Sequence, residues 1–230
     1  GGGNTAVGYQ SLQLNTTGYF NVAVGRAALS ADTLGSGSTA IGYAALNSQN
    51  FTTATDTYNT AVGQYAGAAV TTGTLNTLIG ALTGDALTSG NSNTAVGQFA
   101  LTTDTLGDTS TAIGIYTLKN QNFTTSTDAY NTAVGSFAGE NVTTGIQNTL
   151  IGGLAGDALT DADGNVAVGR AALTTDTLGS QTVAIGSRAL NSQNFTTATD
   201  SYNTAVGADA GLSVTTGVEN TLIGGLAGDA

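Results

Sequence analysis

Apolar and polar residues alternate in a five-residue phrase that recurs thirteen times along the chain. It reads Asn-Thr-Ala-Val-Gly with conservative changes: the third residue is Ala or Leu, the fourth is Val or Ile, and the fifth is always Gly. The first copies begin at Asn4, Asn21, Ser38 and Asn59, and along the chain every fourth interval is four residues longer than the other three. A repeat of this kind predicts a solenoid, in which each unit buries its apolar residues against its neighbours.

The local composition favours strands over helices. Seventeen residues are too few for two packed helices, and a Gly in every copy disfavours a helix. The β-branched fourth position and polar connections such as residues 15–18 favour short strands joined by turns. We therefore predict an all-β protein, a parallel β-solenoid of 13 turns with a 17/17/17/21-residue period. Each turn is expected to hold two strands of roughly four to five residues and two bends.

Alternation along a strand places the second and fourth residues of the phrase on one face and the first, third and fifth on the other. Ala and Gly suit the inside of a thin roll, whereas Thr and Val would form an apolar stripe outside it. An exposed stripe of that length is typical of an interface.

We assign the fourth-position residues to the structural core or to an interface. They are Val7, Val24, Ile41, Val62, Ile79, Val96, Ile113, Val134, Ile151, Val168, Ile185, Val206 and Ile223. The fifth-position glycines are expected to end the strands. They are Gly8, Gly25, Gly42, Gly63, Gly80, Gly97, Gly114, Gly135, Gly152, Gly169, Gly186, Gly207 and Gly224.

The copies group into larger units of four, because each copy is most similar in sequence to the copy four places further along the chain. We predict one continuous repeat domain over residues 1–230, with larger units at 21–92, 93–164 and 165–230, the last incomplete. The final copy stops at Ala230 where its equivalents continue. The chain is therefore expected to be a segment of a longer fibre.

The phrase resembles the head repeat of YadA-like trimeric autotransporter adhesins, whose motif reads Asn-Ser-Val-Ala-Ile-Gly-x-x-Ser/Ala. Residues 182–186 and 21–25 come closest, and residues 4–12 are also similar to repeats of phage tail fibres and of large secreted surface proteins. The resemblance implies a left-handed β-roll and a homotrimeric rod, in which three rolls pack through their apolar strand faces. The longer turns, and Thr where the family has Val, favour a fibre over an adhesin head.

Composition agrees with an extracellular location, on a cell surface or a virion. The chain has 34 Gly, no Cys, His, Met, Trp or Pro, and only 8% charged residues. So restricted a set of residue types is expected where the same local environment recurs in every repeat. It has no apolar run long enough for membrane insertion. The net charge is −11, and its four basic residues are scattered, which argues against nucleic acid as a partner.

The longer intervals carry extra residues at 49–56, 121–128 and 193–200. We expect these segments to project as loops. Their candidate ligand or glycan contacts are Asn50, Phe51, Asn122, Phe123, Asn194 and Phe195. Each Asn-Phe-Thr is formally an N-glycosylation sequence, although its chance occurrence in a Thr-rich loop is the favoured explanation. A Phe in all three loops is better explained by packing of the loop than by ligand contact.

The residue types offer little for catalysis or metal binding. Without His or Cys we expect no catalytic residue, no metal site, no cofactor and no enzymatic activity. Asp residues recur at the interval of the larger unit, but four turns separate the members, too far to share one Ca²⁺, so turn capping is favoured. The segment from Asp161 to Gly164 begins like a calcium loop but lacks the distal Glu. The Asn column is interpreted as a side-chain ladder or a set of turn caps.

Three functional hypotheses remain open. The first is a structural trimeric fibre segment of a phage tail fibre or surface filament, a rigid shaft for attachment to a receptor or glycan. The second is an adhesin head that binds host matrix or glycans. The third is a monomeric ice-binding or carbohydrate-binding solenoid. Ice binding is disfavoured because the outward strand positions alternate Thr with Val and do not form a Thr-x-Thr pattern.

Overall fold

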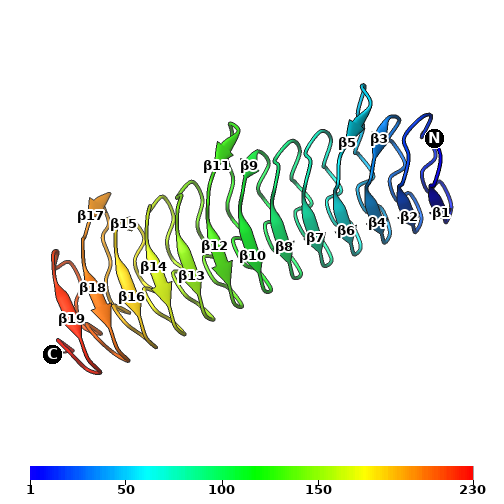
Figure 1. The fold of residues 1–230 in the computed structure, drawn as a ribbon. Helices are drawn as coiled ribbons and strands as arrows, with labels where there is room; N and C mark the ends of the chain where they lie inside the picture. Colours follow the sequence, from blue (N-terminus) through cyan, green and yellow to red (C-terminus); the bar gives the residue numbers. More distant parts are fainter. Residues whose placement is uncertain (230) are drawn as a thin grey trace. The chain divides into compact units, whose positions relative to one another are not determined.

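The computed structural model describes residues 1–229, which form strands, turns and bends and contain no helix (Figure 1). The predicted parallel β-solenoid and its period are confirmed. The chain divides into two compact units: unit 1 comprises 1–110 and 122–128, and unit 2 comprises 111–121 and 129–230. Residues 122–128, the loop of the second longer turn, belong to unit 1, although the residues before and after them belong to unit 2.

Each repeated phrase contributes one three-residue strand, and these strands stack in parallel within each unit. Those of unit 1 are β1 (Thr5–Val7), β2 (Val22–Val24), β4 (Thr39–Ile41), β6 (Thr60–Val62), β7 (Thr77–Ile79) and β8 (Thr94–Val96). Those of unit 2 are β10 (Thr111–Ile113), β12 (Thr132–Val134), β13 (Thr149–Ile151), β14 (Val166–Val168), β16 (Val183–Ile185), β18 (Thr204–Val206) and β19 (Thr221–Ile223).

Pairing keeps equivalent residues of neighbouring copies side by side. In unit 2, for example, Thr132 of β12 pairs with Thr149 of β13, and Val134 pairs with Ile151. The same register holds across a longer interval, since Ile113 of β10 pairs with Val134. The extra residues of the longer turns are therefore accommodated outside the sheet.

The prediction of two strands of four to five residues per turn is wrong. Among residues 1–229 a second strand occurs only beside the longer turns, and it has two residues: β3 (Gly35–Ser36) pairs with β5 (Thr55–Asp56), β9 (Gly107–Asp108) with β11 (Thr127–Asp128), and β15 (Gly179–Ser180) with β17 (Thr199–Asp200). In turns of both lengths left-handed residues bend the chain, as at Gln147 (φ 59°) and Leu154 (φ 61°), and an extended strand cannot pass through them, which keeps the strands short. Backbone hydrogen bonds still join the turns there, for example Leu154 N–H to Ser136 O at 3.0 Å.

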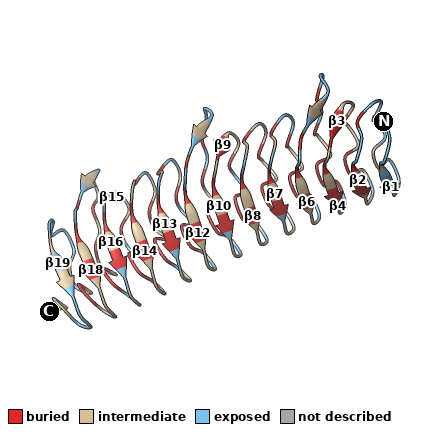
Figure 2. Ribbon diagram, in the orientation of Figure 1, coloured by how far each residue is buried: buried red, intermediate tan, exposed pale blue. Residues whose placement is uncertain are grey.

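The interior is built from the third position and from the small residue and Leu that follow the Gly. Ala133, Ala138 and Leu118 are completely buried, and Figure 2 shows buried residues along the strands of both units. The fourth-position side chains, assigned to core or interface, do not line this interior. Because side chains alternate along a strand, burial of the third residue turns the second and fourth outward.

The first-position Asn residues form a buried ladder, as one reading of that column predicted. Asn76 N–H donates to Asn59 Oδ1 at 2.9 Å, and Asn93 N–H donates to Asn76 Oδ1 at 2.9 Å. The Asn76 side-chain amide also donates to the Gly90 carbonyl at 2.8 Å, across the turn. The ladder satisfies polar groups that would otherwise be costly to bury in so thin a roll.

Core volume is balanced between two positions. In unit 2, Leu150 replaces the usual third-position Ala, and Gly156 and Gly139 stand where other copies have Leu. A Cβ added to either Gly would lie 2.7 Å from a terminal carbon of Leu150. The Leu150 side chain therefore occupies the space that a second Leu would need, and Leu78 has the same relation to Gly84 and Gly67 in unit 1.

This balance predicts coupling between the two positions. Leu150→Ala is expected to lower the free energy of unfolding by about 2–5 kcal/mol, because it leaves a cavity beside two glycines. Gly156→Leu alone should also destabilise the protein, because its side chain would meet Leu150. The double variant should be less destabilised than the sum of the two, by roughly 0.5–3 kcal/mol in a denaturant titration. If the losses of the two single variants simply add in the double variant, the side chains at positions 150 and 156 do not share one space.

Candidate interaction surface

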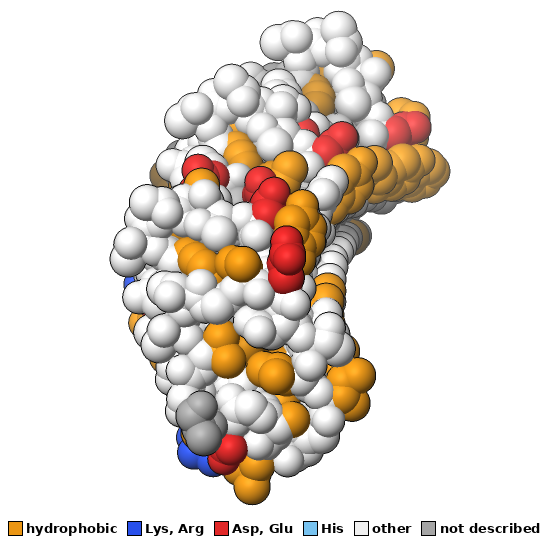
Figure 3. Space-filling model, turned by 90° about the vertical axis from the view of Figure 1, so that its left-hand side faces the viewer, with side chains coloured by type: hydrophobic (Ala, Val, Ile, Leu, Met, Phe, Trp, Pro, Cys, Tyr) orange, Lys and Arg blue, Asp and Glu red, His pale blue; other side chains and the backbone are white. Residues whose placement is uncertain are grey.

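The outward face of the main strands carries two parallel columns, one mainly of Thr and one of Val and Ile. Ile113, Ile151 and Ile185 of unit 2 are 38%, 39% and 37% exposed, and the intervening Val residues are partly exposed. In the end-on space-filling view, hydrophobic side chains form rows that run from turn to turn (Figure 3). We call these two columns the outer strand face.

Register makes the outer strand face regular. Neighbouring strands place the same side-chain position about 4.8 Å further along the stack, and Val or Ile occupies every described fourth position. Within a copy, the Thr and the Val or Ile are two residues apart on the same side of the strand. The sequence thus correctly indicated an outward apolar column in each unit.

A further exposed surface, which sequence analysis missed, lies just beyond the strand-end glycines, and we call its aromatic side chains the aromatic corner. In unit 1 the Arg26 guanidinium lies 5.9 Å from the ring centre of Tyr9 and 5.5 Å from that of Tyr43. Tyr43 in turn meets Tyr65 edge to face at 5.0 Å. The hydrogen bond with Tyr43 is the main cause that raises the pKa of Tyr65, followed by desolvation. The available signal was the recurrence of aromatic residues at the two variable positions after the Gly.

Unit 2 carries the same kind of contact at this corner. The rings of Tyr116 and Phe137 stack with centroids 5.3 Å apart. Lys119 lies 4.9 Å from the centre of the Tyr116 ring and forms an ion pair with Glu140 at 3.3 Å. Aromatic and charged side chains therefore join successive turns on the outside of the roll.

The three longer turns do project, but their Phe residues are not available to a ligand. Phe51, Phe123 and Phe195 are only 7%, 5% and 6% exposed, whereas the adjacent Asn50 and the loop tip at 52–54 are exposed. In the third loop, a Cβ added to Gly179 would lie 2.8 Å from the Phe195 ring. The Phe packs its loop onto the preceding turn, as the packing interpretation predicted.

Buried polar groups fix the base of each loop. In the first, Asp32 Oδ1 accepts from Gly35 N–H at 3.0 Å, and Gln49 donates from its amide to Asp32 Oδ2 at 2.6 Å. Asn59 completes the connection by donating to Gln49 Oε1 at 2.9 Å. Asp32 is fully buried and caps a turn, the role preferred for this Asp column.

The anchoring of the loop can be tested with two neighbouring substitutions. Phe51→Ala is expected to lower stability by about 3–5 kcal/mol, as for other buried aromatic residues, and to expose the loop to proteolysis. Thr53→Ala, at the exposed tip, should change stability by less than about 0.5 kcal/mol. Limited proteolysis and thermal unfolding measure the two effects, and equal behaviour of the two variants would show that Phe51 does not anchor the loop.

Three carboxylates of unit 2 also accept hydrogen bonds within the protein. Asp161 Oδ1 accepts from the Thr144 hydroxyl at 2.7 Å, and Asp163 Oδ1 accepts from Ile146 N–H at 2.7 Å. The carboxylates of the segment that begins like a calcium loop therefore bind groups of the preceding turn. Asp157 accepts from Thr174, and partial burial, the largest influence, raises the pKa of Asp157. Over residues 1–229 no acidic group of metal-binding geometry and no pocket is found.

Comparison of the chain with protein-family models, curated proteins and solved structures gave no significant match. Within the part of the chain that the structure describes, no helix has the length and apolarity needed to span a membrane. The features that remain as functional candidates are the outer strand face, the aromatic corner and the exposed tips of the loops.

Proposed function

We propose that this chain is a segment of a trimeric structural fibre, a phage tail fibre or an extracellular surface filament, that serves as a rigid shaft. The observation that carries the proposal is the in-register Val/Ile column on the outer strand face. In a single chain these residues remain partly in water, and a soluble protein gains free energy by covering a continuous apolar column. Self-association through this face is the simplest way to cover it.

The interior of each unit supports a mechanical role. The hydrogen bonds between paired strands, the Asn ladder and the other backbone hydrogen bonds between turns all run along the stacking direction. Within each unit, successive turns are therefore tied together by recurring sets of hydrogen bonds, which suits a shaft that holds its length. Receptor or glycan contacts, in this proposal, belong to the loop tips or to other parts of the fibre.

The test is the native mass of the segment, measured by light scattering after size exclusion. One chain has a mass of 22.5 kDa and a net charge of −11, and a trimer has three times each value. A measured mass three times that of one chain would support the trimer. The mass of a single chain, found across a range of concentrations, would overturn it.

A trimeric adhesin head shares this assembly and remains the alternative. Its distinguishing property is binding to host matrix or glycans by the segment itself. A trimer that binds immobilised matrix proteins through its loop tips would favour the adhesin, and one that binds none would favour the shaft.

One observation also favours a monomeric ice-binding solenoid as a second candidate. The Thr column of the outer strand face is aligned in register, as for Thr60, Thr77 and Thr94 in unit 1. A regular array of hydroxyl and methyl groups is a surface that can order water. Thermal hysteresis of a monomeric sample would support this function, and its absence would exclude it.

A further inference from the structure

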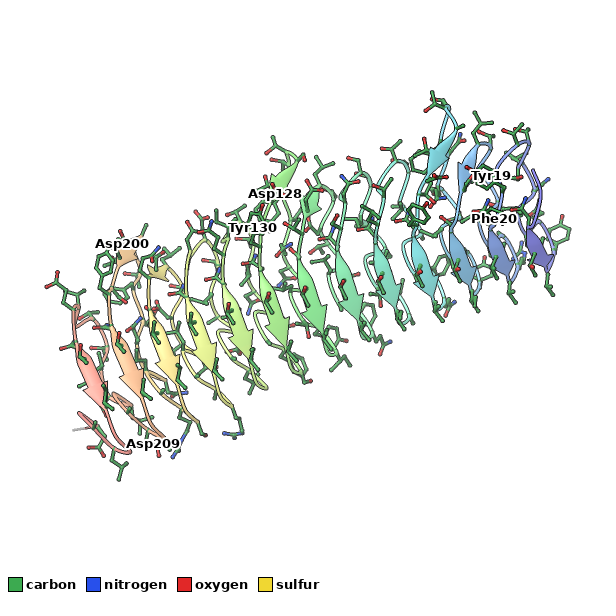
Figure 4. All side chains as sticks on the ribbon, in the orientation of Figure 1. Tyr19, Phe20, Asp128, Tyr130, Asp200 and Asp209 are labelled. Carbon is green, nitrogen blue, oxygen red and sulfur yellow. The ribbon has the colours of Figure 1, made fainter. Side chains whose placement is uncertain are left out.

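Exposed aromatic rings gather on the loop side of unit 1. Tyr19, Phe20 and Tyr58 are 42%, 69% and 58% exposed. The Tyr19 and Phe20 rings meet edge to face with their centroids 5.2 Å apart (Figure 4). The ring of Tyr58 lies over Gly37, where an added Cβ would meet it at 3.0 Å, and Gly37 N–H donates to the Tyr19 carbonyl at 3.0 Å. The three rings therefore border one patch of surface.

A carboxylate lies within the same patch. Tyr19 N–H donates to Ser36 Oγ at 3.1 Å, and the Tyr19 hydroxyl donates to Asp56 Oδ1 at 3.1 Å. The second hydrogen bond is the main cause that raises the pKa of the Tyr19 phenol above its ordinary value. The ion pairs found among residues 1–229 do not include Asp56. The Arg26 of unit 1 lies between Tyr9 and Tyr43 instead.

The repeat itself supplies reference copies of this patch. The Asp and Tyr recur as Asp128 with Tyr130 and as Asp200 with Tyr202, but the positions of Tyr19 and Phe20 hold Asn91 and Ser92 in one copy and Asp163 and Gly164 in the other. In the last copy the Tyr202 hydroxyl donates to Asp200 Oδ2 at 3.4 Å. The turn accepts small polar residues at both positions, so the fold does not require two exposed rings there.

We propose that Tyr19, Phe20, Tyr58 and Asp56 form a surface site for an alkylated ammonium group such as trimethylammonium. Aromatic faces attract cations through their quadrupole, and a nearby carboxylate adds a direct charge interaction. A neutral apolar ligand would contact the rings but would remove water from Asp56 without replacing it, which is unfavourable. The combination therefore selects for a ligand that is both apolar and positively charged. The site does not depend on the trimeric fibre.

The probe is choline, compared with its neutral isostere 3,3-dimethylbutan-1-ol, in a titration followed by the NMR signals of the aromatic rings. We expect saturable shifts of the Tyr19, Phe20 and Tyr58 signals with choline and binding about tenfold weaker with the neutral isostere, since the cation–π and charge contributions are lost. Asp56→Asn should weaken choline binding about five- to tenfold. Equal binding of the two probes would overturn the proposal.

The decisive variant is Tyr19→Asn with Phe20→Ser, which gives the first copy the residues of the second. It should retain the circular dichroism spectrum and lose choline binding, while Tyr202→Ala, a change in the third copy, should leave binding unchanged. Choline binding that persists in the double variant would also overturn the proposal. Sedimentation with phosphatidylcholine vesicles then identifies the source of the cation: co-sedimentation that requires Tyr19 and Phe20 indicates a lipid surface, and choline binding without it indicates a small solute.

Discussion

A variant with Val96→Asp and Val134→Asp should sediment and scatter light as a monomer of 22.5 kDa, whereas the unaltered segment is expected at three times that mass. Both side chains lie on the outer strand face, one in β8 and one in β12, and are partly exposed in the single chain. Assembly through this face would bury six added carboxylates without partners. Each costs several kcal/mol, so the loss of assembly should be complete.

The control adds the same charges elsewhere. Thr53→Asp with Thr125→Asp places two carboxylates on exposed loop tips and should leave the mass of the assembly unchanged. The Val variant should also keep its circular dichroism spectrum, because the altered side chains do not line the interior. If the Val variant stays trimeric, the outer strand face is not the interface.

The second large effect is expected from Gly152→Ala, which should lower the free energy of unfolding by about 3–5 kcal/mol. Gly152 follows β13 with φ of 132°, a conformation that an L side chain rarely adopts. An added Cβ would lie 2.5 Å from the carbonyl oxygen of Gly169 in the next turn. Because that atom is backbone within the stack, it cannot move without separating the turns. Denaturant unfolding measures the loss.

Gly153→Ala provides an adjacent reference for this effect. A Cβ there would have one neighbour, the Ser136 carbonyl oxygen at 3.8 Å, which is an ordinary contact. Other copies hold Ala, Ser or Arg at this position. We expect a change of less than about 0.5 kcal/mol, or slight stabilisation through the unfolded chain. Similar losses for the two variants would mean that the strand-end glycines are not a steric requirement of the stack.

The sequence predicted the loops only in part. Their positions follow from the longer intervals, and their buried Phe residues from the recurrence of Phe51, Phe123 and Phe195. The connection from Asp32 through Gln49 to Asn59 could not be predicted, because it joins residues whose separation along the chain shows nothing of their distance in space. The patch around Tyr19 was missed for the same reason, since Asp56 lies two turns further along the chain.

The sequence alone determined the solenoid, its period and the face of each strand that turns outward. These properties follow from periodicity, because a residue that returns at every turn meets the same surroundings each time. Only the tertiary structure decided that each turn has one three-residue strand, that Leu150 fills the space beside Gly156, and that Tyr19 reaches Asp56. Bends, volumes and side-chain contacts depend on what the neighbouring turns place beside each residue, and a repeat pattern does not contain those distances.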